Sequence, residues 1–89
     1  MLVLPATLTH AEASASLYML LQGLASQTGP VLVDASALQR FDSSALAVLL
    51  QCRREGMSQG RGFTVRALPE RLRSLAKLYG VDLLLPAAV

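Results

Sequence analysis

Short apolar runs alternate with helix-like stretches along this chain and predict the order strand–helix–strand–helix–strand–helix. Residues 2–4 read as a short strand, which Pro5 limits on one side. Residues 31–33 are continuously apolar, as in a strand buried on both faces, and residues 63–67 alternate and are β-branched. With short connections, this order predicts an α/β fold in which helices flank a mostly parallel sheet.

The first and third predicted helices carry clear signals at their ends. Thr9 and Glu12 have the spacing of a capping box. Pro69 fits the first position of the third helix, and Gly80 fits the residue that follows a helix. Both helices have apolar stripes at helical spacing, which the first builds from Ala13, Leu17, Leu20, Leu21 and Leu24 and the third from Leu72, Leu75, Ala76 and Tyr79.

The second predicted helix, from Ser43 or Ser44 to Met57, has more apolar surface than a sheet can cover. Its apolar side chains spread over roughly 200° of the helix, and packing on a sheet needs about half of that. We interpret the surplus as a partner-binding patch rimmed by Arg53 and Arg54. The alternative is that neighbouring helices of the same domain cover it.

Composition supports a small domain that binds another protein. The 89 residues predict one domain, residues 1–89, with 53% hydrophobic and 16% charged residues. A Leu- and Ala-rich bias of the source proteome would also produce such values. Residues 1–39 contain no Lys or Arg, and residues 40–89 contain all eight. This dispersed charge disfavours nucleic acid and suits an acidic protein partner, although Arg71, Arg73 and Lys77 could equally form a solvated face.

The sequence offers no catalytic, metal or cofactor site. His10 has no second ligand residue nearby and fits a surface position just inside a helix. Cys52 lies in mid-helix without a His partner and fits a buried, inert thiol. A Gly-rich phosphate loop, a nucleophilic triad and paired carboxylates are missing. We therefore expect a protein that is not an enzyme and has no cofactor. No membrane-spanning run or cleavable signal is visible, so we expect a cytoplasmic location without membrane insertion.

Two segments of the chain resemble a known family. Residues 42–46, Asp-Ser-Ser-Ala-Leu, look like the signature of STAS domains, in which Gly usually stands at the position of Ala45. Residues 31–38 resemble the strand and loop that precede this signature. Residues 75–81, Leu-Ala-Lys-Leu-Tyr-Gly-Val, resemble the end of the third helix in the MlaB subgroup, the STAS subunits of the Mla phospholipid ABC transport system. The resemblance covers roughly residues 2–85.

The resemblance implies a fold, a partner and a site. The fold would be a small mixed sheet with helices mainly on one face. The function would be that of a non-catalytic subunit that binds and supports the transporter's ATPase, peripheral at the inner membrane through that complex. The expected partner-binding residues are Asp42, Ser43, Ser44, Leu46, Leu75 and Tyr79.

Several alternatives stay open at these positions. Ser43 aligns with the hydroxyl that is phosphorylated in the sigma-regulating branch, so an anti-sigma-factor antagonist switched at Ser43 is the second hypothesis. Ser43 could also be a plain N-cap, as could Asp42, and Tyr79 could be a core aromatic. Finally, relatives usually have an edge strand before the one predicted at residues 2–4. A homodimer through the exposed sheet edge is therefore a further expectation.

Overall fold

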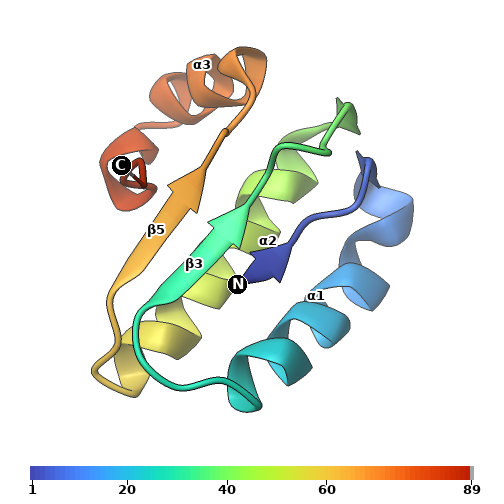
Figure 1. The fold of residues 1–89 in the computed structure, drawn as a ribbon. Coiled ribbons are helices and arrows are strands. Elements are labelled where there is room, and N and C mark those ends of the chain that lie inside the picture. The colour runs from blue at the N-terminus through green and yellow to red at the C-terminus, as the bar shows by residue number, and fades with distance from the viewer. Residues whose placement is uncertain (89) are drawn as a thin grey trace.

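The computed structural model describes residues 1–88 and contains a three-stranded parallel sheet. Its strands β1 (Leu2–Val3), β3 (Val31–Asp34) and β5 (Phe63–Arg66) lie in that order, with Val33 paired to Leu2 on one side and to Val65 on the other. The helices α1 (His10–Ala25) and α2 (Ser43–Ser58) connect the strands and cover the same face of the sheet (Figure 1). The predicted small α/β fold is confirmed, and every strand pairing among residues 1–88 is parallel.

A second, smaller sheet was not predicted. Strands β2 (Thr7–Leu8) and β4 (Arg40–Phe41) pair in parallel immediately before α1 and α2 begin. No strand is predicted at residues 7–8 or 40–41, because a two-residue strand has no periodicity to detect. This pairing brings the first turns of α1 and α2 side by side, which matters for the site described below.

The expectation of an uncovered apolar patch on α2 is wrong. Five apolar side chains of this helix are at most 3% exposed, because α1, α3 (Glu70–Leu78) and the sheet all pack against α2. These are Ala45, Leu46, Val48, Leu49 and Cys52. The buried Gly56 lets α2 approach β3, since a Cβ there would lie 3.0 Å from Val31 Cγ2.

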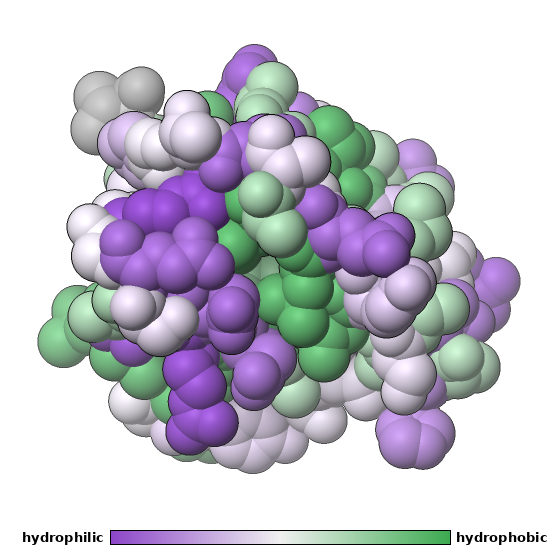
Figure 2. All heavy atoms as spheres, turned by 90° about the horizontal axis from the view of Figure 1, so that it is seen from below, coloured by the Kyte–Doolittle hydropathy of each residue, from purple (hydrophilic) through white to green (hydrophobic). Residues whose placement is uncertain are grey.

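At the end of the molecule seen from below, hydrophobic groups fill the middle and hydrophilic groups border them (Figure 2).

The C-terminal part closes one edge of the sheet. Pro69 is the N-cap of α3 rather than its first residue, and Gly80, with φ 73°, follows the C-cap as predicted. The apolar segment 81–85 contains a 3₁₀ turn, η1 (Asp82–Leu84), and the chain then bridges to β5. Val65 N donates to Pro86 O at 2.9 Å, so this edge of β5 has a partner. None of the helices in residues 1–88 is long and apolar enough to cross a membrane.

Candidate functional site

Asp42 holds the beginnings of two helices together. It is the N-cap of α2, where its Oδ1 accepts a hydrogen bond from Ser44 N at 2.8 Å. Its Oδ2 accepts from His10 N, the first residue of α1, at 3.1 Å. These bonds, the one from Ser44 first, lower the pKa of Asp42. The N-cap interpretation of Asp42 is therefore confirmed, and the carboxylate also joins α1 to α2.

The two serines after Asp42 differ in exposure. Ser43 is exposed and is the first residue of α2, so its interpretation as the N-cap is wrong because Asp42 occupies that position. Ser44 is half-buried and lies beside α1. The hydroxyl of Ser43 therefore stands at the surface, at a helix N-terminus whose first N–H groups are partly satisfied by a carboxylate.

The three predicted apolar and aromatic contacts are placed very differently. Leu46 is only 3% exposed and belongs to the core of the domain, so it is not at the surface where a partner could contact it. Leu75 is partly buried and packs against the core. Tyr79 is 57% exposed as the C-cap of α3, so the prediction that the third helix buries it is wrong. Exposed Leu78 precedes it, with 77% of its surface accessible.

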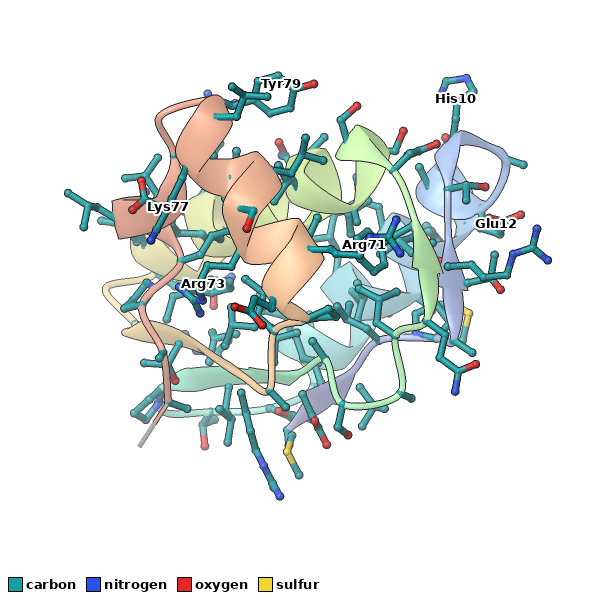
Figure 3. All side chains as sticks on the ribbon, turned by 90° about the horizontal axis from the view of Figure 1, so that it is seen from above. His10, Glu12, Arg71, Arg73, Lys77 and Tyr79 are labelled. Carbon is teal, nitrogen blue, oxygen red and sulfur yellow. The ribbon has the colours of Figure 1, made fainter. Side chains whose placement is uncertain are left out.

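These residues gather at one end of the molecule. Tyr79 and His10 project to the same side, and the first turn of α2 lies between them in the view from above (Figure 3). The guanidinium of Arg71 on α3 stacks over the ring of Phe41, with 5.3 Å from Cζ to the ring centre. This contact ties α3 to the strand that leads into α2. We call the surface formed by Asp42, Ser43, Ser44, Leu78 and Tyr79 the helix-end surface.

A groove beside this surface was missed by the sequence analysis. It has a volume of about 310 Å³ and runs between the first two turns of α1 and α2. Small side chains such as Ala13, Ser14 and Ala47 face each other across it, which leaves the space open. Small residues at helical spacing on both helices were the sequence signal for this groove. They face each other only because the β2–β4 pairing places the starts of α1 and α2 side by side.

His10 and Cys52 occupy the surface position and the buried position that the sequence predicts for them. His10 is exposed at the start of α1, as expected. Cys52 is fully buried, and this burial raises the pKa of its thiol to about 11, in agreement with an inert thiol. Within residues 1–88, no three His, Cys, Asp or Glu side chains come together as metal ligands would.

Comparison with known proteins identifies the family. A search among curated proteins gives no significant match. The family model described as "Mlab, STAS domain" matches residues 1–86, nearly the whole chain. The matched region contains α2 with its capping Asp42 and α3 with its exposed Tyr79. The chain therefore belongs to the MlaB family of STAS domains.

Proposed function

We propose that this chain is the non-catalytic STAS subunit that binds and supports the ATPase of a phospholipid ABC transporter. Family membership supports this proposal, because the family takes its name from such a subunit. The observation that carries it is the helix-end surface, where exposed Ser43 and exposed Tyr79 lie at the same end of the molecule. The chain would then be cytoplasmic and peripheral at the inner membrane through the complex.

The helix-end surface has the composition of a protein contact. Tyr79 and Leu78 offer large exposed side chains, and Tyr residues often carry much of the energy of an interface. The hydroxyl of Ser43 offers a hydrogen-bonding group at the same surface. Lys77, in the last turn of α3, is exposed but projects to another side of this helix than Tyr79 (Figure 3). A partner segment with an apolar centre and a hydrogen-bonding group for Ser43 would complement this arrangement.

Burial changes which residues carry the proposed contact. Leu46 is withdrawn as a contact residue because it is in the core. Leu75 acts indirectly, since it is partly buried one turn before Tyr79 and supports the end of α3 from below. Asp42 also acts indirectly, because both of its carboxylate oxygens accept hydrogen bonds from the helices that it caps.

Co-purification with the ATPase tests the proposal. The chain and a tagged ATPase subunit of such a transporter are co-expressed, and the affinity of the complex is then measured. We expect Tyr79→Ala and Ser43→Arg to weaken binding at least about tenfold while the thermal unfolding curves stay unchanged. Tyr18→Ala is the matched control, because Tyr18 is 65% exposed on α1. Full binding by Tyr79→Ala and Ser43→Arg, or equal loss in Tyr18→Ala, would contradict the proposal.

The alternative, an anti-sigma-factor antagonist, is favoured by one observation. Ser43 is exposed at the first position of a 16-residue helix, where a phosphate would be close to the helix N-terminus but also next to Asp42. Incubation with a partner kinase would then add about 80 Da, one phosphoryl group, and Ser43→Ala would abolish the increase. ATPase binding without any such mass increase decides for the transporter subunit.

A further inference from the structure

The third helix is held to the rest of the domain by few buried side chains. α3 has nine residues, and its two buried ones are Leu72 and Ala76, both with no exposed surface. A leucine and a single methyl group fix how closely α3 approaches its neighbours, but they make too few contacts to prevent the helix from tilting. Contacts at the flanks of α3 therefore decide where its exposed end, with Leu78 and Tyr79, is placed.

Arg71 has an unfavourable position in this helix. It is the second residue of α3, where the helix dipole and the free N–H groups of the first turn favour an acid such as the preceding Glu70. A cation at this position weakens the helix, so the helix itself gives no reason for Arg71. The compensating contact is tertiary, because the exposed guanidinium lies over the ring of Phe41, with 5.3 Å from Cζ to the ring centre.

The other two basic residues of α3 are arranged differently. Arg73 and Lys77 project to the other side of the helix from Arg71 (Figure 3). The sequence left open that all three form one solvated basic face. The stacking on Phe41 separates Arg71 from this face and directs it towards the strand that leads into α2.

Phe41 belongs to a firmly held part of the fold. It pairs with Leu8 of β2, and its side chain packs against the core. Asp42, the N-cap of α2, follows it directly, and Ser43 is the next residue. The stack of Arg71 on Phe41 therefore ties α3 to the segment that presents Ser43.

Tyr79 stands at the far end of the same helix. It follows Arg71 by two helical turns, which places it roughly 12 Å further along the helix axis. A tilt of α3 by about 10° at its first turn would move Tyr79 by roughly 2 Å. A partner that contacts Ser43 and Tyr79 together tolerates little displacement of this kind, because the centres of interfaces are packed as closely as protein interiors.

We propose that Arg71 is a positioning residue of the helix-end surface: stacked on Phe41, its guanidinium sets the tilt of α3 and thereby the distance between Tyr79 and Ser43. Arg71 acts through Phe41 and does not itself touch the partner. This role rests on the proposed function, because the helix-end surface is the contact assigned there to the ATPase. It adds a residue outside that surface on which the shape of the surface depends.

A double-mutant cycle on the affinity for the ATPase tests this role. The unmodified chain, Arg71→Gln, Phe41→Leu and the double variant are each titrated with the ATPase subunit, at a temperature at which unfolding curves show them fully folded. We expect each single substitution to raise the dissociation constant about three- to fivefold. The double variant should bind as weakly as Phe41→Leu alone, because both substitutions remove the same contact. Arg71→Lys keeps a cation over the ring and should restore most of the affinity.

Lys77→Gln is the matched control. It removes the same charge from the side of α3 that faces away from Arg71, and it should change the affinity by less than about twofold. Equal weakening by Lys77→Gln would assign the effect to overall charge. A further loss from Arg71→Gln in the Phe41→Leu background would mean that Arg71 contacts the partner directly. Either result overturns the positioning role, as does full affinity of Arg71→Gln.

A measurement on the free chain separates this role from the proposed function. NMR residual dipolar couplings of the α3 amides should show a changed orientation of α3 relative to β3 and β5 in Arg71→Gln, but not in Lys77→Gln. An unchanged orientation would overturn the positioning role even if the ATPase binds, and this measurement still decides if Phe41→Leu fails to fold. A changed orientation, with no ATPase binding by the unmodified chain, would contradict the proposed function and leave the effect of Arg71 on α3 established.

Discussion

At the scale of single residues, Asp42 shows what local sequence can and cannot reveal. An acid before two serines at the start of an apolar helix predicts an N-cap, and Asp42 and Ser43 were both candidates for it. The structure selects Asp42, because its carboxylate accepts from Ser44 N. Its second bond, from His10 N, joins residues 32 positions apart, and no local spacing signals such a contact.

Ala67 provides a prediction at this scale. It follows β5 with a φ of 58°, a region that costs an L-residue roughly 1–2 kcal/mol. We expect Ala67→Gly to raise the free energy of unfolding by up to about 1 kcal/mol in denaturant titrations. The control is Ala47→Gly in the exposed part of α2, which should lower it by about 1 kcal/mol. Equal destabilisation by both substitutions would show that Ala67 is not strained.

At the scale of elements, α2 is the helix whose environment the sequence described least well. Its wide apolar surface was visible in the periodicity, and we interpreted the surplus as a docking patch. In the structure α2 packs against α1, α3 and β5, so its apolar side chains are buried from several directions. A helix in a central position needs a wide apolar face for its own domain.

Leu46→Asp distinguishes these two interpretations of α2. Leu46 is 3% exposed, so a carboxylate there would be buried without a partner and should lower the free energy of unfolding by about 3 kcal/mol or more. Leu78→Asp, at a position 77% exposed on α3, should change it by less than about 0.5 kcal/mol. Thermal and chemical unfolding measure both effects. Normal stability of Leu46→Asp would mean that the start of α2 is open after all.

At the scale of the whole molecule, Glu12, Asp34 and Asp42 each accept hydrogen bonds at a different connection of the fold. The hydroxyl of Thr9 lowers the pKa of Glu12, and the backbone N–H groups of Ser36 and Ser44 lower those of Asp34 and Asp42. Each carboxylate thus has a lower pKa in the folded chain than in the unfolded chain. Their stabilisation is complete above the unfolded values, near pH 4, and is lost as the pH falls through the folded values.

Acid unfolding tests this linkage. We expect the free energy of unfolding to fall steadily as the pH drops below about 4, because the unfolded chain then binds more protons than the folded chain. Asp42→Asn removes one of the three titrating groups and should make this decline shallower. Denaturant titrations at several pH values measure it. A decline of equal steepness in Asp42→Asn would show that Asp42 does not contribute.

The sequence by itself determined the order of the three main strands and the three helices, the capping box at Thr9 and Glu12, Gly80 after α3 and the family resemblance. These features depend on periodicity and on residues a few positions apart, so they can be seen without a fold. Only the tertiary structure decided that Leu46 is buried, that Tyr79 is exposed and that β2 pairs with β4. Exposure and pairing depend on which distant segments become neighbours, and the hydropathy of one segment contains no information about what packs against it.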